Sequence, residues 1–273
     1  MSRSEIRVEI LGTRGSMPLE GERFSIFGGA TSCVRVVARE QGYSTEEIYL
    51  DAGSGIVLAK PLSDSNISVL LSHLHLDHII GLPFFPALSM RNRKINLFVA
   101  PRSSFGGKEA LDRIFSPPFW PVSIGDYPAD TVVQNISDSF MIGCVRVDTC
   151  ELEHPGGSTC CKLTCGDKVI VYACDFEHSD AGERLLAGFA KNADLLIYDG
   201  QYTQEEYERC KGFGHSIPEI GIKIGEAANV RKLVFSHHSP EHDDDFILKW
   251  EKKLQQENDW VSFARVGETI YFE

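Results

Sequence analysis

The sequence has no hydrophobic run that approaches the roughly 18–20 consecutive apolar residues of a membrane-spanning helix. It also lacks the apolar region of a secretory signal peptide, since Met1 to Glu5 lead directly into a strand-like alternation. We therefore expect no membrane partner, and we predict a cytoplasmic location.

Dense clusters of positive charge are lacking as well. The nearest is Arg91-Asn92-Arg93-Lys94, and the 273-residue chain carries a formal net charge of −12. A long polyanion such as DNA or tRNA would meet net repulsion, so no long nucleic acid is expected as a partner. A small anionic substrate remains compatible with this charge, because bound metal ions reverse the local field.

The chain has eight cysteines but no Cys-x-x-Cys pair. Cys160, Cys161 and Cys165 fall in an apolar-alternating stretch that is typical of a pair of strands. A chain of this length does not need disulfides, so we expect buried free thiols. An accessory metal site built from these three cysteines is the alternative.

Strand-like and helical segments occur in both halves of the chain, and no low-complexity linker separates the halves. The expected strands are 6–11, 33–37, 47–50, 67–71, 95–99, 145–148, 161–164, 169–172, 195–198 and 232–235. The expected helices are about 77–90, 107–115, 179–191, 203–210, 217–228 and 242–256, followed by a hairpin over 260–272. This pattern predicts an α+β fold, a four-layer αββα sandwich, formed by a single domain (1–273) with two ββα-type halves.

Potential metal ligands are concentrated in the run His73-Leu74-His75-Leu76-Asp77-His78, directly after the apolar strand 67–71. Three imidazoles and one carboxylate at a strand exit are a typical metal-binding pattern. In an extended chain His73 and His75 point the same way and can hold one ion. Asp77 and His78 follow where the chain turns into a helix, so they can reach a second ion.

Two ions require more ligands than this run supplies, and three later residues suit the role. His154, Asp175 and His237 each stand at the end of a predicted strand. Ligands at strand ends are held rigidly by the sheet behind them.

The order of these seven residues resembles the metallo-β-lactamase superfamily, and the resemblance extends from Leu11 to about Asp245. It implies the αββα fold, with His73, His75 and His154 on one metal and Asp77, His78 and His237 on the other. Asp175 would bridge the two. It also implies that Asp51 supports the metal-bound histidines; a turn-capping aspartate is the alternative.

The segment Gly212-Phe213-Gly214-His215-Ser216 resembles the phosphodiesterase branch of that superfamily, which includes tRNase Z and cyclic-nucleotide phosphodiesterases. His215 at a helix start suits a general acid or phosphate donor, although a simple helix cap is the alternative. Substrate contacts are expected from Ser158, Thr159 and Ser216.

These features together predict hydrolysis of a cyclic nucleotide or another small phosphodiester by a metal-bridging hydroxide, with Asp77 and His215 as catalytic residues. Two divalent ions are expected; the ligands suit zinc, and manganese or iron would also fit. Hydrolysis of a lactone, thioester, β-lactam or short RNA is the alternative, and a non-catalytic or oxidative di-iron protein is a further one.

The resemblance has one departure that bears on the substrate. In tRNase Z an arm that grips tRNA is inserted between the residues that match His154 and Asp175, and this chain has no room for it there. We therefore expect a small phosphodiester rather than tRNA as substrate. The resemblance also leaves a homodimer open.

Overall fold

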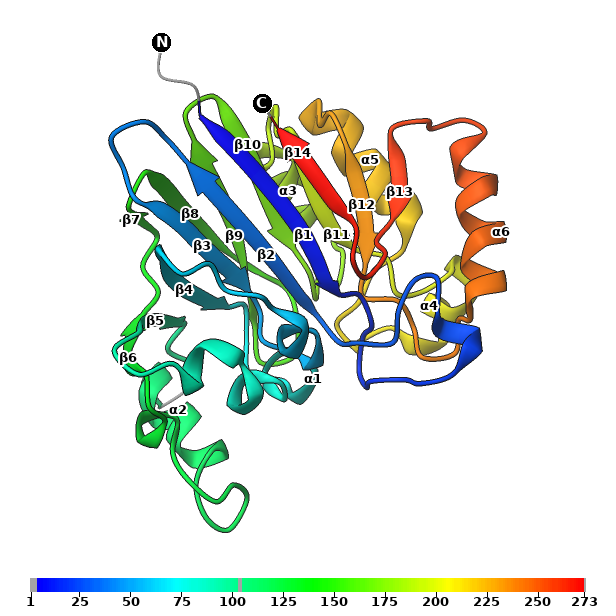
Figure 1. The fold of residues 1–273 in the computed structure, drawn as a ribbon. Helices are drawn as coiled ribbons and strands as arrows, with labels where there is room; N and C mark the ends of the chain where they lie inside the picture. The colour runs from blue at the N-terminus through cyan, green and yellow to red at the C-terminus, as the bar shows by residue number, and fades with distance from the viewer. Residues whose placement is uncertain (1–3, 103–104, 273) are drawn as a thin grey trace.

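Two mixed seven-stranded sheets form the centre of the computed structural model, which describes residues 4–102 and 105–272 (Figure 1). In spatial order the first sheet contains β14 (Thr269–Phe272), β1 (Glu5–Gly12), β2 (Cys33–Arg39), β3 (Thr45–Leu50), β4 (Ser65–Leu71), β5 (Lys94–Val99) and β6 (Asp130–Asn135). The second contains β13 (Val261–Phe263), β12 (Leu233–Ser236), β11 (Leu195–Asp199), β10 (Lys168–Ala173), β9 (Ser158–Cys165), β8 (Val145–Leu152) and β7 (Ser139–Ile142).

The helices lie on the outer faces of the two sheets, so the molecule has four layers (Figure 1). They are α1 (Leu76–Ile79), α2 (Gly107–Ile114), α3 (Asp180–Phe189), α4 (Gln204–Cys210), α5 (Pro218–Ala228) and α6 (Asp244–Gln255). Short 3₁₀ turns are η1 (Glu22–Phe24), η2 (Ser54–Leu58), η3 (Leu82–Phe84), η4 (Pro86–Ser89) and η5 (Ile124–Asp126). The predicted αββα sandwich is confirmed.

The main hydrophobic core lies between the two sheets. Val8 and Val36 from the first sheet and Leu163 and Ile170 from the second are fully buried in one cluster. Because alternate residues of a strand face opposite ways, these strands place a second set of apolar side chains against the helices outside. Each buried aliphatic side chain contributes about 1.5–3 kcal/mol to folding, so the sheets form a rigid support for the loops at their ends.

Two expectations about local structure were wrong, and two strands were missed. The helix over 77–90 is broken into α1, η3 and η4, because Gly81, Pro83 and Pro86 interrupt the helical hydrogen bonding. The hairpin over 260–272 does not form: β13 pairs with β12 in one sheet and β14 pairs with β1 in the other. The strands β6 and β7 were not predicted, because most of their side chains are exposed and lack a clear apolar alternation.

The structure also bears on the cysteines and on the question of a membrane-spanning helix. Cys160, Cys161 and Cys165 are buried free thiols, as predicted. The described part of the chain contains no helix whose length and apolar character would allow it to span a bilayer.

Candidate metal centre

The potential ligands gather where strands from both sheets end. His73 follows β4 and His154 follows β8, while Asp175 follows β10 and His237 follows β12 directly. The backbones of Asp51, Asp175 and His237 are in the left-handed region, with φ of 60°, 58° and 63°. This conformation is uncommon for residues other than glycine and persists only where surrounding contacts enforce it. Sharp turns at the strand ends therefore direct these side chains into the site.

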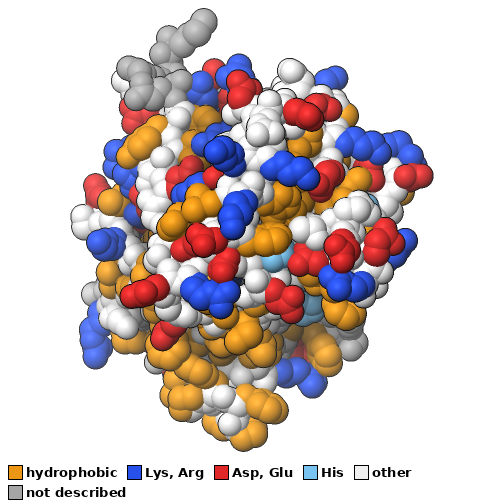
Figure 2. Space-filling view, turned by 90° about the vertical axis from the view of Figure 1, so that its right-hand side faces the viewer, with side chains coloured by type: hydrophobic (Ala, Val, Ile, Leu, Met, Phe, Trp, Pro, Cys, Tyr) orange, Lys and Arg blue, Asp and Glu red, His pale blue; other side chains and the backbone are white. Residues whose placement is uncertain are grey.

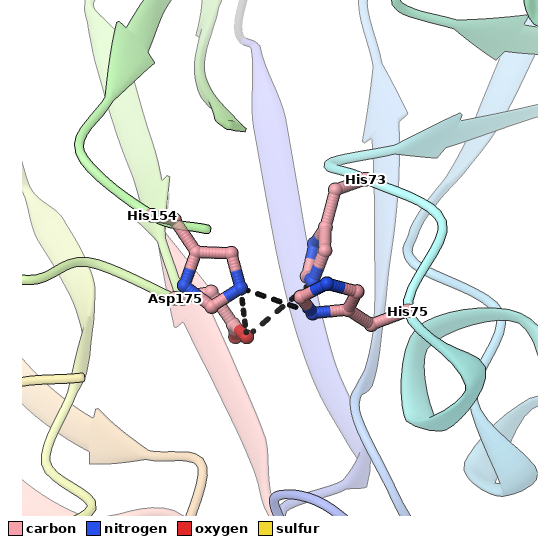
Figure 3. A group of neighbouring side chains, drawn as sticks. All are labelled: His73, His75, His154 and Asp175. Carbon is pink, nitrogen blue, oxygen red and sulfur yellow. Dashed lines mark hydrogen bonds and ion pairs between the residues drawn. The ribbon is translucent and has the colours of Figure 1, made fainter. Parts of the chain in front are cut away.

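One group of four ligand atoms comes from His73, His75, His154 and Asp175, and all four atoms lie within 4.8 Å of one another (Figure 3). Nε2 of His154 lies 3.0 Å from Nδ1 of His75. Asp175 Oδ2 lies 3.5 Å from Nε2 of His73 and 3.5 Å from Nε2 of His154. The three imidazoles and the carboxylate therefore face a common point.

A second group comes from Asp77, His78 and His237. Nε2 of His78 lies 3.1 Å from Nε2 of His237, and Asp77 Oδ2 lies 3.2 Å from the same His237 nitrogen. The other oxygen of Asp175, Oδ1, lies 3.1 Å from His78 Nε2 and 3.2 Å from His237 Nε2. Asp175 thus presents one oxygen to each group and lies between them.

Protein partners hold the ring nitrogens of His154 and His237 that face away from the site. Nδ1 of His154 donates to the carbonyl oxygen of Gly214 at 2.7 Å, and Nδ1 of His237 donates to Gln201 Oε1 at 2.6 Å. These hydrogen bonds fix the ring orientation and leave the other ring nitrogen facing the site.

Asp51 lies behind His78. Its Oδ2 atom is 2.7 Å from Nδ1 of His78 and accepts a hydrogen bond from Tyr172 Oη at 2.8 Å. The carboxylate also accepts from the backbone N–H and the hydroxyl of Ser72, the residue before His73. Asp51 therefore contacts both the ring of His78 and the segment that carries His73, a geometry that suits a supporting carboxylate.

Burial and neighbouring charges set the protonation of both groups. Burial lowers the pKa of His73, His75 and His154 below the ordinary value, which favours the neutral imidazoles that metals bind. Burial alone would raise the pKa of Asp175, but His237 and His78 hold it well below its usual range. The first group is thus ready to bind a cation, with neutral rings and an ionised carboxylate.

In the second group the carboxylates together outweigh the effect of burial on the pKa values of the histidines. Burial by itself lowers the pKa of His237, yet Asp175 and Asp77 raise it to about 9. The pKa of His78 is likewise raised by Asp175 and Asp51 against the effect of burial. The carboxylates therefore attract positive charge to this point, as a proton or as a metal ion.

Two observations show that divalent cations fit these residues. Among the described residues, the buried atoms His73 Nε2 and Asp175 Oδ1 have no hydrogen-bond partner. Imidazole nitrogens also face one another at 3.0 and 3.1 Å, a separation at which two lone pairs repel unless a cation or proton lies between them. Imidazole and carboxylate ligands are those that zinc and similar ions prefer.

His215 lies beside both groups, from a loop just before α5. Its ring stacks on His237 with centroids 4.8 Å apart and packs edge-on to His154 at 5.5 Å. Nδ1 of His215 lies 2.9 Å from Asp199 Oδ2, and the residue is 9% exposed. Nδ1 is therefore engaged by a carboxylate, and Nε2 is the ring nitrogen left for a substrate.

The three expected substrate contacts need correction. Ser158 and Ser216 are fully buried: Ser158 donates to the carbonyl of Cys174, and the hydroxyl of Ser216 bonds to Tyr198 and His178. Thr159 is 4% exposed, and its hydroxyl accepts a hydrogen bond from Arg102. These three hydroxyls bond to groups of the protein itself. They lie behind the site and do not line its open side.

Three residues that were not predicted from the sequence hold His215, His237 and the loop before His215 in place. Asp199 ends β11 and contacts His215, while Gln201, two residues later, holds His237. Glu177 accepts hydrogen bonds from the backbone N–H groups of Gly212 and Gly214 and so fixes the loop before His215. The position of Asp199 at a strand end, like that of Asp175, was the signal available in the sequence.

The fold and these converging side chains define a metal-dependent hydrolase. The chain belongs to the β-lactamase superfamily: the model of the Beta-lactamase superfamily domain matches residues 47–238, which include all seven potential ligands. A solved structure with a similar fold is the metallo-β-lactamase fold protein YhfI from Bacillus subtilis. The match covers 99% of this chain and 100% of the YhfI chain, with a TM-score of 0.72 and 18% sequence identity.

Several curated relatives carry the name Ribonuclease Z. The protein from Ignicoccus hospitalis is 26% identical over 71% of this chain and 79% of its own length. The protein from Methanosarcina acetivorans is 25% identical over 91% of this chain and 93% of its own.

These relatives contradict the expectation that long nucleic acids are excluded as partners. Relatives that match 71% and 91% of this chain carry the name Ribonuclease Z. The net charge of −12 sums over the entire surface, and part of it comes from carboxylates inside the candidate metal centre. Net charge was therefore a poor guide to what can approach this site.

Proposed function

We propose that this chain is a phosphodiesterase that uses two divalent metal ions. The observation that carries the proposal is the position of Asp175, whose two oxygens face two separate groups of ligands. The relatives named Ribonuclease Z favour a phosphodiester over a lactone, thioester or β-lactam.

One ion would be held by His73, His75, His154 and Asp175, and the other by Asp77, His78, His237 and Asp175. The bound ions would lower the pKa of a coordinated water and offset negative charge on the phosphate oxygens. The ligand set favours zinc, and manganese or iron is compatible with it.

The protein's own groups would orient the substrate and move protons. Asp77 Oδ2 accepts a hydrogen bond from the backbone N–H of Ser16 at 2.7 Å, which fixes the carboxylate beside the site and suits it to orient the attacking water. His215 would donate a proton from Nε2 to the leaving alkoxide, while Asp199 stabilises the imidazolium and holds Nδ1.

RNA is the substrate class that the relatives favour. A small or cyclic phosphodiester is the second candidate, because a cavity of about 530 Å³ beside the site has the size of a small-molecule pocket. A cytoplasmic location remains a prediction.

A substrate panel tests the proposal. Purified protein with added zinc or manganese is assayed on a ribo-oligonucleotide, cyclic mononucleotides and bis(p-nitrophenyl) phosphate, with a lactone and a β-lactam for comparison. We expect hydrolysis of the diesters, abolished by a chelator and by His154→Ala. Turnover of the lactone or β-lactam alone, or binding of metal without any turnover, would contradict it.

A further inference from the structure

A cavity of about 530 Å³ opens next to the candidate metal centre. Its walls come from the loop after β11, from α4 and the loop that follows it, and from the loop after β12. Figure 2 views the side of the molecule on which α4 and α6 lie, and it shows histidine side chains at the surface among charged and hydrophobic ones. Small-molecule sites commonly have volumes of about 300–1,000 Å³, so the cavity is large enough for a nucleoside.

The cavity is directly connected to both the ligands and His215. Gln201, which lines it, accepts the hydrogen bond from His237, and the backbone of Ser16, another lining residue, donates to Asp77. The ring of Tyr202 forms part of the wall and packs edge-on to His215 at 5.7 Å. A group attached to a phosphate at the metal centre would therefore enter this cavity.

Phe213 and Arg209 both line the cavity, and both side chains are exposed to solvent. Phe213 is 63% exposed and, among the described residues, packs against no other ring. Arg209, in the last turn of α4, is exposed and makes no hydrogen bond or ion pair within the part of the chain that the structure describes. An exposed aromatic ring is the kind of surface on which proteins stack nucleobases.

Two acidic residues line the cavity, Glu206 and Glu241, and among the described residues neither forms an ion pair with Arg209. Glu206 binds His242 with one oxygen and caps α4 at Thr203 with the other, so it does not neutralise Arg209. An exposed guanidinium and an exposed aromatic ring in the same cavity match a nucleotide, because such a ring can stack on the base and a guanidinium can bind a phosphate oxygen.

We propose that this cavity binds the nucleotide next to the scissile phosphate, with its base stacked on Phe213 and its further phosphate or sugar near Arg209. This inference rests on the proposed phosphodiesterase function and specifies its substrate class as nucleotides. Phe213 and Arg209 are thereby specificity-determining residues, which do not touch the reacting bond.

Binding of two simple ligands tests the inference without requiring turnover. Calorimetry would compare adenosine 5′-monophosphate with ribose 5-phosphate, which shares its phosphate and sugar but has no base. Stacking of one base contributes about 5- to 150-fold in affinity, so wild type should prefer the nucleotide by a factor in this range. Phe213→Ala should reduce this preference to near unity, whereas Phe213→Trp should keep it.

The control is Phe119→Ala, which removes an equally conspicuous phenylalanine, 79% exposed, that does not line the cavity. Arg209→Ala should weaken both ligands by a similar factor, whereas Arg184→Ala, at an exposed arginine on α3, should weaken neither. Equal affinity of wild type for the two ligands, or a preference that survives Phe213→Ala, would overturn the inference. Failure of the phosphodiesterase proposal is seen separately, as an absence of diester hydrolysis in the substrate panel.

Discussion

The carboxylate of Asp199 lies 2.9 Å from Nδ1 of His215, although the two residues come from different elements, the end of β11 and the loop before α5. Asp199 is fully buried, and its other oxygen accepts the backbone N–H of Gln201. The pair resembles the arrangement in which a buried carboxylate orients a histidine that transfers protons. Asp199 is accordingly a positioning residue in the proposed mechanism.

Asp199→Asn should lower kcat for an RNA or alkyl diester by about 10- to 100-fold, because the amide stabilises the imidazolium less well. KM should change little, since Asp199 does not reach the substrate. Steady-state kinetics would measure both values. Asp194→Asn serves as the control, because Asp194 is also buried and paired, with Arg231, away from the ligands. Equal effects of the two substitutions would show that Asp199 has only a structural role.

His215→Ala should slow substrates with poor leaving groups by about 10²–10⁴-fold, since these need a proton at the departing oxygen. The loss should be much smaller for bis(p-nitrophenyl) phosphate, whose leaving group departs without protonation. The comparison requires kcat/KM for both substrates with the same metal-loaded preparation. Equal losses on the two substrates would contradict the role of His215 as a general acid.

Asp51→Asn should weaken metal binding by about 10- to 100-fold, because the ring of His78 loses its carboxylate partner. Competition with a chromogenic chelator would give the metal affinity. Tyr172→Phe is the graded comparison: it removes one hydrogen bond to the same carboxylate and should have a smaller effect. Unaltered metal affinity in Asp51→Asn would favour the alternative that Asp51 serves the turn alone.

Removal of metal should destabilise the protein. At a free metal concentration of 100 times Kd, binding adds about 2.7 kcal/mol to the free energy of unfolding, which corresponds to roughly 5–10 °C in Tm. Thermal unfolding with a chelator and after readdition of zinc would measure the shift. In His154→Ala the response to zinc should be smaller. A wild-type Tm that is the same with and without metal would contradict tight binding at this site.

The candidate metal ligands could be predicted from the sequence because they are histidines and aspartates that follow apolar strands. The run from His73 to His78 follows an apolar strand, and His154, Asp175 and His237 each follow another strand, so their convergence could be predicted. The αββα sandwich followed from the same alternation of strands and helices. Strand ends are rigid and few, which restricts where such residues can meet.

The rest depended on tertiary contacts that leave little trace in local sequence. Asp199 and Gln201 act through partners that are distant in the chain, and nothing in their immediate neighbours indicates His215 or His237. Ser158 and Ser216 carry hydroxyls that suit a substrate, but burial commits them to the protein. The final strands separate into two sheets because each finds an edge to pair with, β12 for β13 and β1 for β14.

Anomalous diffraction from a crystal of the zinc-loaded protein tests the central claim most directly. The account predicts two peaks about 3.5–4 Å apart, with Asp175 between them, His73, His75 and His154 on one, and Asp77, His78 and His237 on the other. A single peak, or peaks that do not contact Asp175, would contradict it.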